Sequence, residues 1–196
     1  MTKASETRLA ILKKAFELIY TSGYQTTSID DIIATTQVTK GAFYYHFKNK
    51  DEMGLAVINE LMAPTMLTNF IEPLQKSENP LNDIYTLIKK LLLGNPFLKM
   101  EYGCPASNLT HEMSPVNNAF NLILSELSKQ WQEALEECLN KGKKNGQVNS
   151  SVNAKQTAFF IMSGYWGIRN LGKLGNNADC YQTYLKELKK YLKTCE

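Results

Sequence analysis

The sequence predicts an all-α protein with a small three-helix head at its N-terminus and a larger helical bundle after it. Apolar residues recur at the helical period in nearly every segment, and no segment alternates as a half-buried strand does. Cap residues such as Ser, Thr and Asn precede these stretches, and Gly or Pro interrupts them, which divides the chain into about nine helices. We place the head at residues 1–50 and the body at residues 51–196.

Three helices are expected in the head. The first runs from about Ser5 to Thr21, and Gly23 ends it. The second begins at Ser28, whose hydroxyl caps the helix while Asp31 closes a capping box. A short turn follows, and Thr39 caps the third helix.

The body is predicted to hold six more helices. Pro64 is expected to kink or end the first of them, because proline lacks an amide hydrogen and its ring clashes with the preceding turn. Ser114-Pro115 is typical of a cap followed by an N1 proline, which predicts the start of a helix of roughly thirty residues. The expected spans are 49–64, 79–94, a short helix within 102–113, a long one from 114 to Gly142 or Gly146, 153–174 and 179–193.

Positive charge is concentrated in the head. The chain has a formal net charge of +3, and residues 1–50 hold seven basic against four acidic side chains, so the body is neutral. This asymmetry predicts a polyanion partner for one end of the protein only.

Several function classes find no support in the sequence. No run of about eighteen apolar residues occurs, so no membrane span is predicted, and the N-terminus lacks the apolar core of a signal peptide. The four cysteines have no metal-finger spacing and suit a reduced cytoplasm. With two histidines and no motif for a nucleophile, a phosphate loop or a dinucleotide, we expect no enzyme, no metal and no cofactor.

The third predicted helix favours nucleic acid. Phe43 and Phe47 lie four residues apart, so both can face the core, and residues 32–50 contain no acidic side chain. The remaining positions present lysine, tyrosine and histidine, which donate to phosphates, and the helix N-terminus at Thr39 also favours an anion. Two short helices joined by a tight turn, with a third across them, make a helix-turn-helix and predict double-stranded DNA as partner.

Two segments of the head resemble a known family. They are Gly23-Tyr24-Gln25-Thr26-Thr27-Ser28-Ile29-Asp30-Asp31-Ile32 and Val38-Thr39-Lys40-Gly41-Ala42-Phe43-Tyr44-Tyr45-His46-Phe47-Lys48-Asn49-Lys50-Asp51-Glu52. Through them residues 5–60 resemble the TetR family of bacterial transcriptional regulators. The chain departs from the family pattern at Thr36 and Gln37, where Ala-Gly is usual, which leaves the docking angle of the third helix open.

The resemblance implies a dimer in which the third helix enters the major groove of DNA. It implies that Tyr44, His46 and Lys50 hold phosphates and that Ser28 touches the backbone. Lys48 lies in the same basic row as Lys40 and Tyr44 and joins the predicted DNA contacts. Thr39, Lys40, Gly41 and Tyr45 would then lie at or near base edges.

In the body the resemblance is one of architecture, with a local similarity to one branch of TetR-type ligand domains at Gly103-Cys104-Pro105, Asn108-Leu109 and Glu112-Met113-Ser114-Pro115. It suggests a repressor released by a small-molecule effector. We expect a homodimer through the last two helices, where apolar stripes and small residues allow close helix packing. The effector pocket is expected between the fifth and eighth helices. Its candidate residues are Phe97, Met100, Tyr102, Cys104, Asn108, His111, Trp131, Phe159 and Trp166.

Three alternatives to this cytoplasmic repressor remain open. Cys104 lies in a Gly-Cys-Pro turn and is a candidate sensor of oxidants or electrophiles. The body is also compatible with a helical carrier whose basic head is incidental. An enzyme with Cys104 as nucleophile and His111 as base is disfavoured, because no third group orients the pair.

Overall fold

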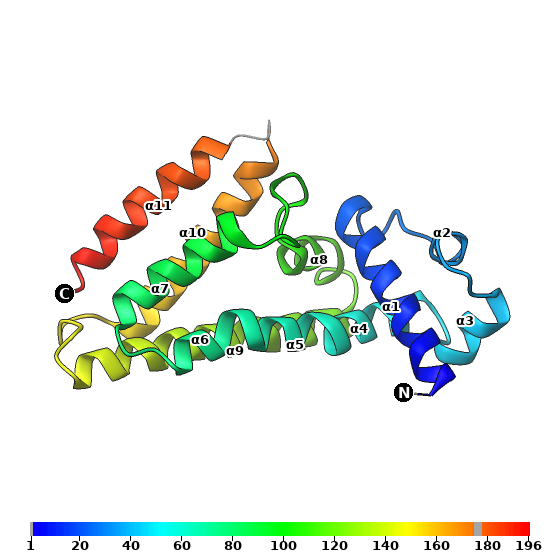
Figure 1. Cartoon of the computed structure of the whole chain (residues 1–196), viewed down its shortest axis with the longest axis horizontal. Coiled ribbons are helices and arrows are strands. Elements are labelled where there is room, and N and C mark those ends of the chain that lie inside the picture. The colour runs from blue at the N-terminus through cyan, green and yellow to red at the C-terminus, as the bar shows by residue number, and fades with distance from the viewer. Residues whose placement is uncertain (1, 175–177) are drawn as a thin grey trace. The chain divides into compact units, whose positions relative to one another are not determined.

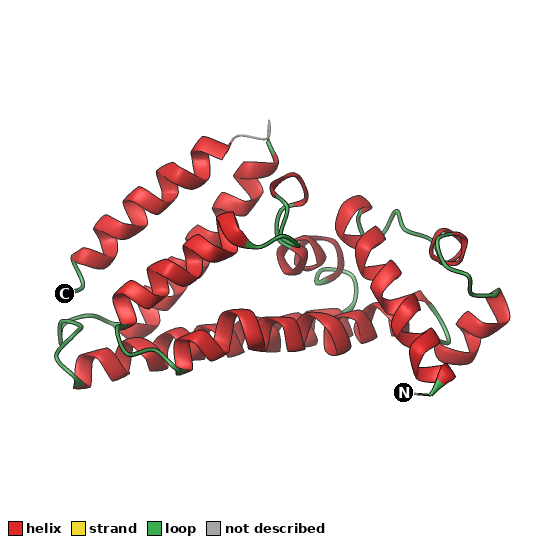
Figure 2. Cartoon of the chain, in the orientation of Figure 1, coloured by secondary structure: helices red, strands yellow, loops and turns green. Residues whose placement is uncertain are grey.

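The computed structural model describes residues 2–174 and 178–196. All regular structure within these residues is helical, as Figure 2 shows. When the continuous stretches over 50–75 and 80–94 are each counted once, the described residues form nine helices and one short 3-10 turn, which confirms the all-α prediction.

The head contains α1 (Lys3–Ser22), α2 (Ile29–Ala34) and α3 (Lys40–His46), and Figure 1 shows α2 and α3 packed beside α1. Gly23 ends α1 with a φ of 98°, a conformation that favours glycine. Ser28 and Asp31 form the expected capping box at α2, and the Thr39 side chain accepts from the amide of Ala42 at α3. The local signals in the sequence therefore located all three helices.

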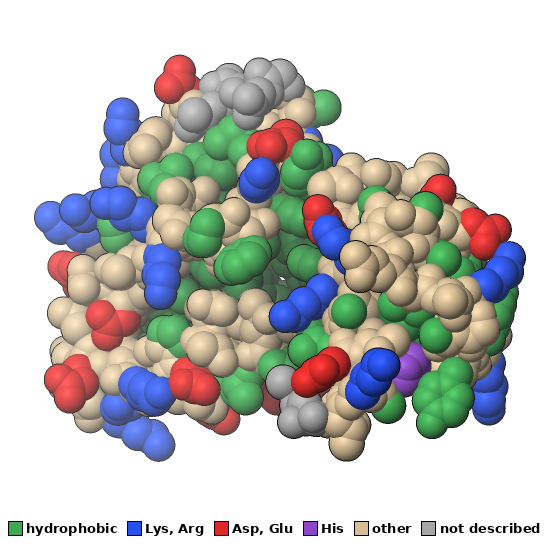
Figure 3. Space-filling view, turned by 45° about the vertical axis from the view of Figure 1, so that its right-hand side comes forward, with side chains coloured by type: hydrophobic (Ala, Val, Ile, Leu, Met, Phe, Trp, Pro, Cys, Tyr) green, Lys and Arg blue, Asp and Glu red, His purple; other side chains and the backbone are tan. Residues whose placement is uncertain are grey.

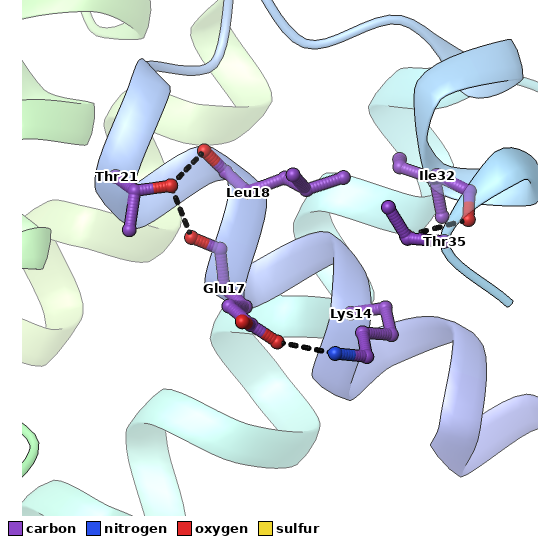
Figure 4. Close-up of polar contacts among 6 residues, drawn as sticks. All are labelled: Lys14, Glu17, Leu18, Thr21, Ile32 and Thr35. Carbon is purple, nitrogen blue, oxygen red and sulfur yellow. Dashed lines mark hydrogen bonds and ion pairs between the residues drawn. The ribbon is translucent and has the colours of Figure 1, made fainter.

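Between α1 and α2 the packing is apolar, while polar side chains bond within their own helix. Figure 4 shows Leu18 of α1 pointing toward Ile32 of α2 and toward Thr35, the residue that directly follows α2. In the same view Thr21 donates to carbonyls one turn earlier in α1, and Thr35 donates to the carbonyl of Ile32. These hydroxyls are satisfied by their own backbone and leave the contact between the helices to side-chain packing.

Pro64 does not end the fourth helical stretch. The stretch comprises α4 (Lys50–Val57), the π-helical turn η1 (Ile58–Met62), α5 (Ala63–Met66), a second π-helical turn η2 (Leu67–Ile71) and α6 (Glu72–Gln75). The amide of Ala63 donates to the carbonyl of Ile58, five residues back. Such a wide turn directly before the proline gives its ring and the freed carbonyls room. Of the two expected outcomes, an end of the helix at Pro64 was wrong, and the structure has a local departure from the α-helical pattern instead.

The remaining elements are α7 (Pro80–Lys89), the π-helical turn η3 (Lys90–Gly94), the 3-10 turn η4 (Met100–Tyr102), α8 (Pro105–Met113), α9 (Asn118–Lys144), α10 (Ala154–Lys173) and α11 (Ala178–Lys193). The predicted start of α9 at Ser114-Pro115 was wrong. The side chain of Asn117 caps the helix instead, accepting from the amides of Ala119 and Phe120 at 3.0 and 3.4 Å. The residues before it form the turn that closes α8.

The chain divides into two compact units. Unit 1 comprises Met1–Thr65 and Pro105–Glu126, and unit 2 comprises Met66–Cys104 and Leu127–Glu196. The sequence-based boundary at residue 50 is a functional division and stays a prediction. By packing, the unit that holds the head also includes the first part of the body and the corner between α8 and α9.

In unit 2, α7, α10 and α11 run alongside one another (Figure 1). The apolar stripe of α11 is buried against α7 and α10, so this unit uses within itself a stripe that the sequence assigned to the dimer. No helix in the described part of the chain is long and apolar enough to cross a membrane.

Candidate nucleic-acid interface

Two buried rings fix α3 to the rest of the head. Phe43 and Phe47 are almost fully buried, and their ring centroids lie 5.7 Å apart. The Arg8 guanidinium of α1 lies 4.4 Å from the centroid of the Phe47 ring and donates to the carbonyl of His46 at 3.1 Å. A hydrogen bond to Glu60 raises the pKa of Arg8. Because its inner side is held in this way, α3 presents its other side in a fixed orientation.

The outward side of α3 consists of tyrosine, lysine and glycine. Tyr45 is 79% exposed and Tyr44 47% exposed, and Lys48 is exposed directly after the helix. The His46 ring lies edge-on to Tyr45, with centroids 5.0 Å apart. In Figure 3 basic side chains, a histidine and hydrophobic side chains gather on one face of the unit that holds the head. This mixture of cations and amphipathic rings suits phosphate and base contacts.

Gly41 is not required by the fold. A Cβ atom at this position would meet no other atom within 4 Å, and the backbone has no positive φ. In a helix, glycine is less stable than alanine by about 0.5–1 kcal/mol, so its presence is a local cost. Glycine here leaves the helix surface flat, which permits the close approach of a partner.

Lys40 is paired within the head. Its Nζ lies 2.9 Å from the Asp30 carboxylate, and this hydrogen bond raises the pKa of Lys40. Both side chains are exposed, so water and salt screen the pair, and a phosphate or a base edge can compete with Asp30 for the ammonium group. Asp30 lies just before the acid-free window of residues 32–50, so the pairing of Lys40 was not predicted from that window.

Lys50 points into the head. Its Nζ donates to the carbonyls of Tyr24 and Thr27 at 2.9 and 3.1 Å and lies 4.5 Å from the centroid of the Tyr24 ring. The donors of this ammonium group are thereby directed at the loop between α1 and α2. The resemblance assigned Lys50 to a phosphate, whereas its contacts here fasten that loop.

The two predicted cap residues, Ser28 and Thr39, also form hydrogen bonds within the head. The Ser28 hydroxyl lies 2.6 Å from the Asp31 carboxylate, and the hydrogen bonds from Ser28 lower the pKa of Asp31. Thr39 accepts the amide of Ala42, and the first amides of a helix have no acceptor within the helix itself. The helix end at Thr39 can therefore receive an anion without loss of its cap.

The predicted pocket residues fall into both units. Asn108 and His111 belong to unit 1, where His111 is exposed and its Nδ1 lies 2.8 Å from the carbonyl of Ser107. The other candidates belong to unit 2, where Phe97 is 77% exposed and Phe159 is 48% exposed. The buried or half-buried candidates of unit 2 are Met100, Tyr102, Cys104, Trp131 and Trp166.

An aromatic cluster around Trp131 was only partly predicted. The rings of Phe70, Trp131 and Tyr165 meet edge to face, with centroids 5.3 to 6.1 Å apart. The indole nitrogen of Trp131 is buried and donates no hydrogen bond within the described residues. Phe70 was not among the predicted residues, because the expected span of its helix, 49–64, stopped before it.

A buried arginine in unit 2 was missed. Arg169 is fully buried and donates to the carbonyls of Leu98, Lys99 and Gly103, in the loop that precedes α8. It is the single charged residue between positions 156 and 172 of an otherwise apolar helix, and that pattern is a usable sequence signal.

The groups of His, Cys, Asp and Glu in the described residues include none that could hold a metal ion.

Comparison with known proteins places this geometry in a family. Residues 11–57 match a family described as bacterial regulatory proteins of the tetR family, and residues 87–188 match one described as the tetracyclin repressor-like C-terminal domain. An uncharacterized HTH-type transcriptional regulator in the lacX 3' region of Lactococcus lactis subsp. lactis is 35% identical over 136 residues, which cover 68% of each chain.

Two further relatives extend over most of the chain. The HTH-type transcriptional repressor DhaR of Mycobacterium sp. (strain GP1) is 24% identical over 185 residues, 91% of this chain and 88% of DhaR. The crystal structure of a TetR-family transcriptional regulator from Cytophaga hutchinsonii has a TM-score of 0.89 at 19% identity and covers 100% of this chain and 98% of that one. With a helix-turn-helix head and a matching helical body, this chain belongs to the TetR family of bacterial DNA-binding transcriptional regulators.

Proposed function

We propose that this protein is a homodimeric repressor that binds an operator through α3 and leaves it when a small molecule binds in unit 2. The observation that supports this most is the outward side of α3. Its rings are exposed, its lysines are accessible, and Gly41 is a residue that the fold itself does not need. A surface of this kind suits a partner that approaches the helix closely.

The contacts on DNA follow from the exposed groups. Tyr44, His46 and Lys48 are assigned to phosphates, and Thr39, Gly41 and Tyr45 to positions at or near base edges. Lys40 joins the base-edge group once it exchanges Asp30 for DNA. Ser28 is assigned to the backbone and Lys50 to the support of the α1–α2 loop, with the phosphate role implied by the resemblance as its alternative.

The dimer is assigned chiefly to α10. Phe160, Ser163, Gly167 and Leu171 follow one another at steps of three and four residues, and all are exposed. Such steps place them on one side of the helix. A long apolar side with small residues at its middle suits close packing against α10 of a second copy. Two heads related by a two-fold axis then read two half-sites about 34–36 Å apart.

An effector is assigned to the neighbourhood of Trp131. A buried indole N–H without an acceptor is unusual in a native fold and costs free energy. A ligand that carries a carbonyl or another acceptor would satisfy it, between the rings of Phe70 and Tyr165. Phe97 and Phe159, both well exposed, are the weakest members of the predicted pocket.

Thiol sensing by Cys104 is the second candidate. The thiol is buried next to Gly103, whose carbonyl accepts from Arg169, and a Cβ on Gly103 would lie 2.6 Å from Cδ of Lys173. Arg169 and the aliphatic part of Lys173 therefore lie at the turn that holds Cys104, and a cation close to a thiol favours thiolate chemistry. If the thiol is the sensor, hydrogen peroxide releases wild-type protein from DNA but leaves Cys104→Ala bound.

Selection of bound DNA from a random pool tests the proposal, followed by binding to the selected duplex at increasing salt. We expect two related half-sites and an affinity that falls linearly with salt on logarithmic axes. Binding to the selected duplex in the presence of small apolar compounds with an acceptor group then tests release. A pool that shows no enrichment and no salt-dependent retention would support the carrier alternative and refute the repressor.

A further inference from the structure

One carboxylate in unit 1 joins the head to the corner between α8 and α9. Asp51, in the first turn of α4, accepts the Tyr24 hydroxyl on Oδ1 at 2.6 Å and the Asn117 side-chain amide on Oδ2 at 3.0 Å. Tyr24 lies in the α1–α2 loop and is 1% exposed, and Asn117 caps α9. Both oxygens of a single side chain are thus used to connect segments 27 and 66 residues away.

The packing around this carboxylate is tight. The Tyr24 and Phe120 rings meet edge to face with centroids 5.1 Å apart. Gly54 of α4 lies against both, because a Cβ there would be 2.7 Å from Cε2 of Tyr24 and 2.8 Å from Cζ of Phe120. Burial, together with the hydrogen bond to Asp51, raises the pKa of the Tyr24 hydroxyl, which therefore remains a donor.

A second contact joins the same corner to the same loop. The Glu112 carboxylate, near the end of α8, accepts the backbone amide of Gln25 at 2.9 Å. Lys50, at the start of α4, also donates to carbonyls of this loop. The segment from Gly23 to Ser28, which leads into the cap of α2, is therefore held by side chains from two elements, α4 and α8.

We propose that Asp51 and Asn117 are positioning residues, through which the α8–α9 corner fixes the α1–α2 loop and so the presentation of α3 to DNA. The inference rests on the proposed function and deepens it. The α8–α9 corner, which is outside the three-helix head in the sequence, then determines how large a change in the distance between two half-sites the protein tolerates. The hydrogen bonds are directional and partly buried, so they restrict the orientation of the loop that they hold.

The decisive variant exchanges the donor for an acceptor with almost no change of shape. Asn117→Asp places two carboxylates against each other, while the Asp side chain still caps α9. The double variant Asp51→Asn with Asn117→Asp restores a donor and an acceptor in reversed order, and the amide oxygen introduced at position 51 still accepts from Tyr24. Asn121→Asp is the control, because it adds the same charge at an exposed position in the first turn of α9.

Hydrogen exchange of the amides of residues 23–28 tests the junction without DNA. In Asn117→Asp we expect exchange at Gln25 and Thr27 to accelerate by about tenfold or more, with wild-type rates in the double variant and in the control. Unchanged rates in Asn117→Asp, or no recovery in the double variant, would overturn the proposal. Should Asn117→Asp not fold, Tyr24→Phe is the second variant, because it removes the hydroxyl that donates to Asp51 and keeps the ring. We expect the same acceleration of hydrogen exchange at Gln25 and Thr27.

Binding to the selected duplex, with and without one inserted base pair between the half-sites, tests the consequence for DNA. The insertion turns one half-site by about 35° relative to the other. Wild-type affinity should fall on the order of tenfold, and that of Asn117→Asp by less than about threefold, with the half-site sequence preference unchanged. Equal losses in both proteins overturn the positioning role alone, whereas a wild type that binds no DNA overturns the repressor.

Discussion

Replacement of Gly41 by alanine separates folding from DNA recognition. A Cβ on Gly41 meets nothing within 4 Å, so the change removes the conformational cost of glycine near the start of α3 without any clash. The expected gain is about 0.5–1 kcal/mol. For a chain of this size it raises the melting temperature by about 1–4 °C. Because the new methyl group projects from the side assigned to DNA, operator affinity should fall by about tenfold or more.

Thermal melting and fluorescence anisotropy with the selected duplex measure the two effects on one preparation. Gly54→Ala is the matched control, because the same substitution in α4 directs a Cβ to 2.7 Å from Tyr24. It should lose about 1–3 kcal/mol through overpacking. A stabilised Gly41→Ala with undiminished affinity would refute close approach at this position. A destabilised Gly41→Ala would contradict the open space around it.

Three other predictions concern separate parts of the molecule. Lys50→Met should lower the free energy of unfolding by about 1–3 kcal/mol and leave the salt dependence of DNA binding unchanged, because its ammonium group bonds to loop carbonyls. Lys48→Met should leave the free energy of unfolding unchanged and reduce the salt slope of DNA binding by about one. A reduced salt slope for Lys50→Met would instead support the phosphate contact that the family resemblance implies for Lys50. Burial opposes ionisation of Asp83, yet the bonds from its neighbours outweigh it and lower its pKa below the ordinary 3.8. The stability that Asp83 contributes is thus present above that value and lost as pH falls through the lower folded pKa, so urea unfolding of wild type and Asp83→Asn should converge at acidic pH. Leu171→Glu should convert a dimer to a monomer in light scattering with unchanged circular dichroism, since the leucine is 57% exposed in the single chain.

Local features of the structure were accessible from the sequence. Gly23, Ser28 and Thr39 act within three or four residues of themselves, so their chemistry determines the helix boundaries without help from the rest of the chain. The spacing of Phe43 and Phe47 likewise separated the buried side of α3 from the exposed side. The face of the candidate DNA surface follows from these short-range patterns.

Features that depend on distant residues were not accessible. Nothing near Lys50 in the sequence indicates that its ammonium group reaches carbonyls 23 to 26 positions earlier. Asp30 pairs with Lys40 across the turn, and a charge count of one helix overlooks it. At α9 the cap is Asn117 and not the predicted Ser114, and the side-chain amide of Asn117 bonds to Asp51, 66 residues earlier in the chain.

The long reach of these contacts has a consequence for synthesis of the chain. The caps of α1, α2 and α3 join residues three positions apart, and they can form as soon as each helix leaves the ribosome. The bond from Gln25 to Glu112 spans 87 residues, and those from Arg169 to its loop span 66 to 71. A nascent head therefore exists for some time with its α1–α2 loop unfastened, and a ribosome that stalls before residue 112 displays helices whose final orientation has yet to be set.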